Sequence, residues 1–186
     1  MRGCDTRNIL AGSKRCIGVM LLILSLLSLL PTLGETEEDP GRSPKKPRFE
    51  VTPQVLQDNV TGLMWTVNAD IADRTFSWDG AQDYLIRMNI DRYAGYRNWR
   101  MPSLEELETV IAQVRTMGFD GMSPERSVAA GFRQLGVMNM QSDGYWTSTT
   151  NMYYSAEAWY VNMTGGSCAV GDKTLYFALW PVRPFR

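Results

Sequence analysis

Residues 95–107, GYRNWRMPSLEEL, contain the clearest helix signal in the chain. Ser103 and Glu106 have the spacing of a capping box, in which each side chain accepts the other residue's backbone N–H, and they directly follow Pro102. The apolar residues after this box recur at helical spacing: Leu104, Leu107, Ile111 and Val114. The segment therefore predicts a helix that begins after Ser103 and packs one apolar stripe on a core.

The charged residues of this segment have a catalytic and a structural interpretation. Arg100 and Glu106 could form a catalytic charge pair, and Glu105, Glu106 and Glu108 could supply the carboxylates of a hydrolase. Structurally, the Arg100 guanidinium would hydrogen-bond loop carbonyls or a nearby carboxylate and hold the turn that enters the helix. Negative charge is also favourable at a helix start. We favour the structural interpretation and assign no catalytic residue.

Two further helices are predicted around this one. Ser77 is a candidate N-cap, and the residues after it show a helical apolar pattern: Trp78, Ala81, Leu85 and Met88. A weaker pattern covers 124–135, within a longer stretch (117–143) that is otherwise rich in Gly, Met and Ser. The middle of the domain is therefore expected to hold two or three helices.

Strands are expected at both ends of the domain. A turn at 61–62 leads into a short strand over 63–66. The alternation over 158–163 predicts three inward and three outward side chains, Trp159, Val161 and Met163 against Ala158, Tyr160 and Asn162. Turns are predicted at 165–166 and 171–172, and a final strand over 175–183. This order predicts an α+β fold in which an antiparallel sheet pairs the two ends of the domain.

The composition is that of a globular protein and excludes several kinds of site. The chain has 186 residues, 44% of them hydrophobic and 21% charged, with a net charge of -1 and no histidine. This excludes collagen-like, coiled-coil and wholly disordered chains, and also Ser-His-Asp triads, Cys-His pairs and histidine-ligated metals. Beyond residue 34 the only cysteine is Cys168, expected to be a half-buried, inert thiol. We predict no cofactor and no metal site.

The chain before the domain is expected to serve export. An apolar run over 16–30 follows four basic residues, Arg2, Arg7, Lys14 and Arg15, and 1–34 is predicted to be a signal peptide. The alternative is an uncleaved anchor, since 17–33 approaches the length that spans a bilayer. Residues 35–48 contain three prolines and no large apolar residue, which predicts a disordered linker before a domain at 49–186. The domain is therefore expected in the periplasm or at the cell surface.

Six strings occur together in one order: DNVTGLMW (58–65), SWDGAQ (77–82), GYRNWRMPSLEEL (95–107), YWTST (145–149), AWYVN (158–162) and LWPVR (179–183). This set closely resembles the Lcl C-terminal domain family, named for the end domain of a bacterial collagen-like adhesin. The resemblance implies an exported bacterial domain of unknown function, with a fold similar to C-type-lectin-like and formylglycine-generating-enzyme domains. The best-known member binds sulfated glycosaminoglycans as a trimer, but this chain has no Gly-X-Y repeat to form the trimerising stalk.

Tyrosines supply the first group of candidate binding residues. Tyr153 and Tyr154 follow Met152 in a predicted loop, and Tyr160 and Asn162 are predicted on an outer strand face. Tyrosines at such positions are common contact residues because they offer contact area at a low cost in entropy. The alternative is that they are strand formers that tolerate solvent.

A basic and aromatic stretch supplies the second group. Arg92, Arg97 and Arg100 are interleaved with Tyr93, Tyr96 and Trp99, which could suit an anionic polymer such as a sulfated glycan. However, residues 49–186 carry 11 basic and 15 acidic residues, and polyanion binding needs a dominant positive field. No nucleic-acid partner is predicted.

The sequence gives less support to two other kinds of site. Four tryptophans could form a sugar-stacking platform but are predicted to be core residues: Trp65, Trp99, Trp146 and Trp159. A calcium site would have to use Asp120, Asp143 or Asp172, and no carboxylate-rich loop supports one.

Three functions remain open at this point. The first is an exported, non-catalytic binding domain that recognises a glycan or an envelope or surface protein. The second is a structural or assembly subunit of an envelope complex, and the third is a carboxylate-dependent hydrolase. Membrane contact is expected only through an uncleaved N-terminal segment, and an oligomer stays open.

Overall fold

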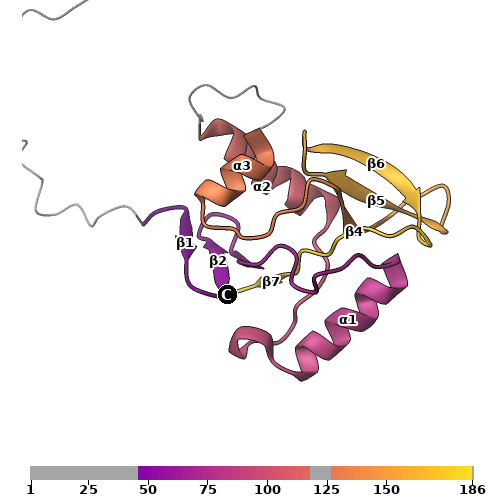
Figure 1. Cartoon of the computed structure of the whole chain (residues 1–186), viewed down its shortest axis with the longest axis horizontal. Coiled ribbons are helices and arrows are strands. Elements are labelled where there is room, and N and C mark those ends of the chain that lie inside the picture. The colour runs from indigo at the N-terminus through magenta and orange to yellow at the C-terminus, as the bar shows by residue number, and fades with distance from the viewer. Residues whose placement is uncertain (1–45, 118–126, 186) are drawn as a thin grey trace, which may run out of the picture. The chain divides into compact units, whose positions relative to one another are not determined.

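The structure is a computed structural model that describes residues 46–117 and 127–185 (Figure 1). The predicted signal peptide, residues 35–45 of the predicted linker, Asp120 and the start of the predicted third helix lie outside the described residues. Among the helices of the described ranges, none has the length and apolar character needed to cross a membrane.

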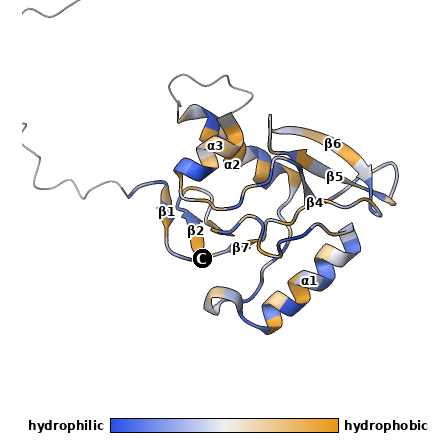
Figure 2. Ribbon diagram, in the orientation of Figure 1, coloured by the Kyte–Doolittle hydropathy of each residue, from blue (hydrophilic) through white to orange (hydrophobic). Residues whose placement is uncertain are grey.

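Within the described residues, three helices form the middle of the domain, in agreement with the two or three predicted. They are α1 (Trp78–Ile90), α2 (Leu104–Thr116) and α3 (Ser127–Gln134), with a short 3-10 turn, η1 (Tyr93–Gly95), after α1. The Ser77 hydroxyl accepts the Gly80 N–H at 3.2 Å and so caps α1. Figure 2 shows orange and blue residues alternating around α1, and its buried residues are Ala81, Leu85 and Met88. These elements follow from local sequence signals.

The strands form two antiparallel sheets. The first has the order β1-β2-β3-β7 and contains β1 (Phe49–Val51), β2 (Val55–Asp58), β3 (Leu63–Thr66) and β7 (Val182–Pro184). The second contains β4 (Gly144–Thr150), β5 (Glu157–Asn162) and β6 (Ser167–Asp172) in sequence order. In the first sheet Trp65 of β3 lies opposite Val182 of β7, so the pairing of the two ends of the domain is confirmed. The α+β class is confirmed as well.

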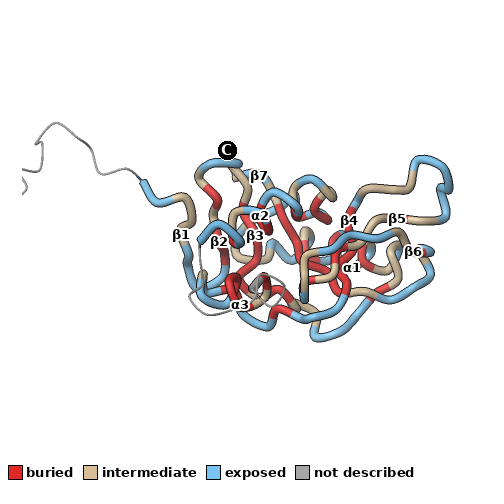
Figure 3. The backbone as a smooth tube through the Cα atoms, turned by 90° about the horizontal axis from the view of Figure 1, so that it is seen from above, coloured by how far each residue is buried: buried red, intermediate tan, exposed pale blue. Residues whose placement is uncertain are grey.

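Neighbouring residues along the strands point into two different hydrophobic clusters. The first cluster includes Trp65, Tyr145 and Trp180 together with the buried faces of α2 and α3. The second includes Met64, Trp146 and Leu179 together with the buried face of α1. Strands covered on both faces are expected to read as nearly continuous apolar runs. Figure 3 shows buried residues along β2, β3 and β4, and exposed residues in the loop between β4 and β5.

This double coverage corrects the pattern predicted for β5. Val161 and Met163 are buried as expected, but Ala158, predicted to point outward, is buried too. Trp159, predicted to point inward, is only half-buried. The first two belong to one cluster and Ala158 to the other, so β5 lies between both and does not have a fully exposed outer face.

The predicted ends of the last strands were also wrong. Gly171 lies within β6, opposite Ala158, and the turn begins one residue later, where the Leu175 N–H donates to the Asp172 carbonyl at 2.9 Å. A Cβ at Gly171 would lie 3.2 Å from the Tyr160 ring, so the glycine is explained by packing and not by a turn. The predicted strand over 175–183 is interrupted, with isolated bridges at Phe177 and Ala178 before β7 begins.

Two single-residue expectations also changed. Arg48, placed in the predicted linker, already belongs to the folded unit: its guanidinium forms hydrogen bonds of 3.0 and 2.9 Å to the buried carboxylate of Asp58. The same guanidinium donates to the Gln113 side chain of α2 at 2.5 Å. Cys168 is exposed, not half-buried, because its position on β6 is on the edge strand of the second sheet.

Candidate functional site

The loop between β4 and β5 presents three large, strongly exposed side chains. Met152, Tyr153 and Tyr154 are 85%, 79% and 67% exposed. The base of this loop is held by Asn151, whose side chain accepts the Tyr153 N–H at 3.1 Å and donates to the Glu157 carboxylate at 2.7 Å. The loop is therefore an ordered platform for side chains that contribute nothing to the core.

A second exposed segment lies at the same end of the sheet. Leu175 and Tyr176, in the turn after β6, are 47% and 67% exposed. Glu157, which begins β5, lies opposite Asp172, which ends β6, so the two loops are adjacent (Figure 1). The Lys173 N–H also donates to the Ala156 carbonyl at 2.9 Å. We call this group the tyrosine tip; its members are Met152, Tyr153, Tyr154, Leu175 and Tyr176.

The start of α1 is bonded to the two segments that carry the tyrosine tip. The Trp78 backbone N–H donates to the Lys173 carbonyl at 2.9 Å, and its indole N–H donates to the Thr147 carbonyl at 2.8 Å. The Lys173 ammonium lies 4.2 Å from the centroid of the Trp78 ring and 3.1 Å from the Thr150 hydroxyl. These contacts join β4, the turn after β6 and the start of α1.

Sequence reasoning found only part of this surface. Tyr153 and Tyr154 were predicted as contact residues, whereas Leu175 and Tyr176 were assigned to a strand. The local signal that could have found them is Asp172, whose side chain accepts both the N–H and the hydroxyl of Thr174, at 2.8 and 2.6 Å. These hydrogen bonds lower the pKa of the Asp172 carboxyl below its ordinary value.

Tyr160 is held in the interior of the second sheet's packing. Its ring is half-buried and stacks on Phe177, with 4.1 Å between centroids and an angle of 23° between the ring planes. It also meets Trp146 edge-on at 6.3 Å. Gly144 leaves room for this arrangement, because a Cβ there would lie 2.7 Å from Phe177 and 2.8 Å from Tyr160. The position of Tyr160 therefore indicates a packing role.

Asn162 lies at the opposite end of β5 from the tyrosine tip. Its side chain accepts the Thr164 N–H at 2.8 Å, and its backbone carbonyl accepts the Gly166 N–H at 2.7 Å. Gly166 has a φ of +68°, which confirms the predicted hairpin at 165–166. The side chain of Asn162 thus shapes a turn and is not brought together with Tyr153 or Tyr154.

The two predicted arginines are both exposed but lie in different depressions. Arg92 follows α1 in a left-handed conformation (φ 53°, ψ 56°) and lines a cavity of about 580 Å³ beside that helix. Arg97 lines a separate depression with Ile86 and Ile90, two exposed apolar residues of α1. The structure therefore does not join the basic residues of 92–100 into one surface.

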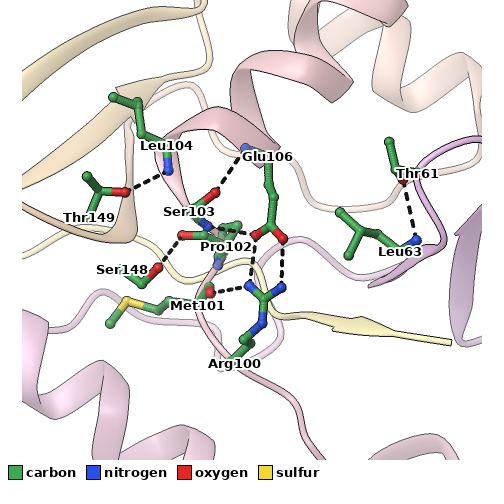
Figure 4. A network of polar contacts seen from close by, with 10 residues as sticks. All are labelled: Thr61, Leu63, Arg100, Met101, Pro102, Ser103, Leu104, Glu106, Ser148 and Thr149. Carbon is green, nitrogen blue, oxygen red and sulfur yellow. Dashed lines mark hydrogen bonds and ion pairs between the residues drawn. The ribbon is translucent and has the colours of Figure 1, made fainter. Parts of the chain in front are cut away.

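Arg100 and Glu106 form the structural pair favoured above. The guanidinium donates to both carboxylate oxygens, at 2.8 and 2.6 Å, and to the Met101 carbonyl at 3.1 Å (Figure 4). The same carboxylate accepts the Ser103 N–H at 2.8 Å, and the Ser103 hydroxyl accepts the Glu106 N–H at 3.1 Å. The predicted capping box is confirmed, and the ion pair holds the turn before α2.

These contacts also determine the ionisation of Glu106. Burial raises the pKa of the carboxyl, but the hydrogen bonds from Arg100 and Ser103 outweigh it, and the pKa is lowered. A general acid needs the opposite shift. The ion pair and capping box therefore account for Glu106 without a catalytic role.

Three of the four tryptophans are core residues, as predicted. Trp65, Trp99 and Trp146 are at most 2% exposed.

The family model of the Lcl C-terminal domain matches residues 54–183, a span that runs from just before β2 into β7. The chain belongs to the Lcl C-terminal domain family. No curated protein matches the chain.

In this Lcl C-terminal domain the candidate calcium ligands are not gathered. Asp143 directly precedes β4, near Asn162, whereas Asp172 ends β6 opposite Glu157 at the other end of the sheet. Among the described residues, no three His, Cys, Asp or Glu side chains are placed to hold a metal ion. The family match includes the tyrosine tip and both predicted arginines.

Proposed function

We propose that this Lcl C-terminal domain is an exported, non-catalytic binding domain of the bacterial envelope or surface, and that the tyrosine tip recognises a glycan or a protein. The observation that carries the proposal is that two neighbouring segments, one between β4 and β5 and one directly after β6, carry five exposed apolar and aromatic side chains. Exposed apolar and aromatic side chains that neighbouring segments present together are typical of an interaction site.

The chemistry of the tyrosine tip suits such contacts. A tyrosine ring can stack on the apolar face of a sugar or on a protein side chain, and its hydroxyl can donate or accept a hydrogen bond. Anchoring by Asn151 and Lys173 reduces the entropy lost on binding, because the loops are already ordered. The lectin-like fold that the family resemblance implies would suit a binding role, and the N-terminal sequence predicts export.

Met152 and Leu175 favour a second candidate, a structural or assembly subunit that contacts another envelope protein. Both are aliphatic side chains that cannot hydrogen-bond a sugar, and methionine is enriched in protein interfaces. Size-exclusion chromatography of the chain with an envelope extract separates the two candidates. A discrete co-eluting protein that is lost when the tyrosine tip is substituted favours the assembly candidate. If no protein co-elutes, that candidate is weakened.

A glycan array tests the leading proposal. The chain is purified without the N-terminal segment if export removes that segment. It is applied with and without calcium, beside the Tyr153→Ala and Tyr154→Ala variants. We expect selective binding that each variant weakens at least tenfold. The matched control is Val60→Ala, because Val60 is 69% exposed, close to the 67% of Tyr154, but lies in the turn between β2 and β3. Selective binding that both tyrosine variants retain would refute the tyrosine tip as the site.

A further inference from the structure

A cavity of about 580 Å³ lies between α1 and the chain on either side of it. Three arginines line it from three segments: Arg74 precedes the helix, Arg87 belongs to its last turn and Arg92 follows it. Tyr84, Tyr93 and Asp91 are also in the wall. The three guanidinium groups therefore outnumber the single carboxylate. We call this site the arginine cavity.

The arginines of the cavity are not engaged in ion pairs within the part of the chain that the structure describes. Among the described residues, no carboxylate forms an ion pair with Arg74, Arg87 or Arg92, whereas Arg48 and Arg100 each have one. Arg74 does lie over the Phe76 ring, 4.7 Å from its centroid. Guanidinium groups present planar, forked donors that match carboxylate and phosphate oxygens. The cavity thus offers unpaired positive charge in a domain whose overall charge is negative.

The backbone of this wall is strained and firmly attached. Arg92 and Ala94 both have a φ of 53°, in the left-handed region that residues other than glycine rarely adopt. The Asn89 side chain accepts the Trp99 N–H at 2.7 Å and donates to the Trp99 carbonyl at 2.8 Å, which ties the segment to α1. Strain of this kind persists where the surroundings impose it, often at ligand sites.

The two tyrosines add neutral hydrogen-bond donors. Burial raises the pKa of the Tyr84 hydroxyl, although Arg74 and Arg87 act in the opposite direction, and burial raises the pKa of Tyr93 as well. Both hydroxyls therefore stay protonated at physiological pH. Within residues 46–117 and 127–185, the hydrogen bond of the Tyr84 hydroxyl is a long one, 3.5 Å to the Ile71 carbonyl, which leaves the hydroxyl able to engage a ligand.

We propose that the arginine cavity binds a small ligand carrying a carboxylate or phosphate group, with Arg87 and Arg92 contacting the anion and Tyr84 and Tyr93 its neutral part. The volume is within the range of small-molecule sites, about 300–1,000 Å³. A discrete anion fits better than a long polyanion, because Arg97 faces another depression and Arg100 is paired with Glu106. Arg87 lies about 14 Å along α1 from Trp78, which anchors the tyrosine tip, so this site does not depend on the proposed function.

Trp99 provides a spectroscopic probe of the cavity. Its indole N–H donates to the Tyr93 carbonyl at 3.2 Å, and its ring meets the Tyr93 ring edge-on at 5.9 Å. A ligand that contacts Tyr93 is therefore expected to shift the NMR signal of this N–H. Glucuronate, glucose 6-phosphate and glucose are suitable probes, because they share one ring and differ in the anionic group. Ionic strength is kept constant in each titration.

The test uses the ¹⁵N-labelled chain as the bacterium processes it. We expect a saturable shift of the Trp99 indole signal with at least one of the two anionic sugars and none with glucose, and the responding sugar identifies the anion. Arg87→Gln and Arg92→Asn should each weaken binding at least tenfold, asparagine being chosen because it tolerates the left-handed conformation. Arg97→Gln, which removes a neighbouring charge outside the cavity, should bind like the wild type.

Two results would overturn the proposal. One is a folded protein whose Trp99 signal shifts with neither anion or equally with glucose. The other is binding that Arg87→Gln and Arg92→Asn leave unchanged. Amide spectra of all variants identify any that fail to fold. If Arg87→Gln fails to fold, Arg87→Lys is used in its place, because lysine keeps the positive charge but lacks the paired N–H donors of the guanidinium. Arg87→Lys is expected to weaken phosphate or carboxylate binding by a smaller factor than charge removal.

Discussion

Ala94 has a backbone conformation that is unfavourable for a residue with a side chain. It lies in η1 with a φ of 53° and a ψ of 21°, next to Gly95, whose φ is 82°. A left-handed conformation costs a non-glycine residue roughly 1–2 kcal/mol. Together with Arg92, it turns the chain after α1 so that Tyr93 and Ala94 line the arginine cavity. The strain is thus localised where the cavity is formed.

The substitution Ala94→Gly tests this strain. Relief of the left-handed conformation, less the entropy cost of glycine, should raise the free energy of unfolding by roughly 0.5–1 kcal/mol in urea denaturation. The matched control is Ala112→Gly, on the exposed side of α2, which should lower it by about 1 kcal/mol. A destabilising effect at both positions would contradict the strain at Ala94.

At the scale of elements, the start of α2 is a junction of the two halves of the sequence. The Leu104 N–H donates to the Thr149 hydroxyl at 3.0 Å, and the Ser148 hydroxyl to the Pro102 carbonyl at 3.3 Å, so β4 helps to hold the start of the helix (Figure 4). Glu106 adds the capping box and the ion pair on the other side. One helix end is therefore held by both local and distant partners.

The Glu106→Gln variant tests the charge at this junction. Glutamine keeps the capping acceptor but loses the charge, so we expect a loss of about 1 kcal/mol at neutral pH, where the ion pair is partly exposed. Because folding lowers the pKa of Glu106 from 4.5, its contribution is fully present above that pH and is lost as the pH falls through the folded-state pKa. Urea unfolding of both proteins from neutral to acidic pH should show the difference shrinking below about 4.5; a difference that grew would contradict the assignment.

At the scale of the whole domain, Arg48 ties the beginning of the fold to its centre. Its guanidinium joins the buried Asp58 of β2 to Gln113 of α2, two elements separated by most of the first half of the domain. The carboxylate of Asp58 also accepts the Val60 N–H at 3.0 Å. A buried charge held in this way is costly to leave unpaired.

Asp58→Asn is therefore expected to be the most disruptive single substitution proposed for the fold. Loss of the charge leaves the Arg48 guanidinium without its carboxylate and should cost roughly 3 kcal/mol, measured as a fall in the midpoint of urea unfolding. Lys46→Gln is the control, because the ion pair of Lys46 with Glu50 is largely exposed and should be worth less than about 0.5 kcal/mol. Similar losses in the two variants would show that burial of Asp58 contributes little.

Some features of this domain were determined by the sequence alone. The helix starts at Ser77 and Ser103, the strand over 63–66 and the hairpin at 165–166 were all predicted, because caps, periodicity and turns depend on residues only a few positions apart. The six strings also identified the family, and the roles of Arg100 and Glu106 followed from their spacing beside the capping box.

The tertiary structure alone decided which surfaces exist. It covered both faces of β5, which made Tyr160 a packing residue, and it brought the segment after β6, with Leu175 and Tyr176, next to the loop between β4 and β5. It also gathered Arg74, Arg87 and Arg92 around one cavity, while Arg97 was separated from them. The physical reason is that burial and proximity depend on how elements far apart in the chain pack together. Sequence patterns over a few neighbouring residues do not determine that packing.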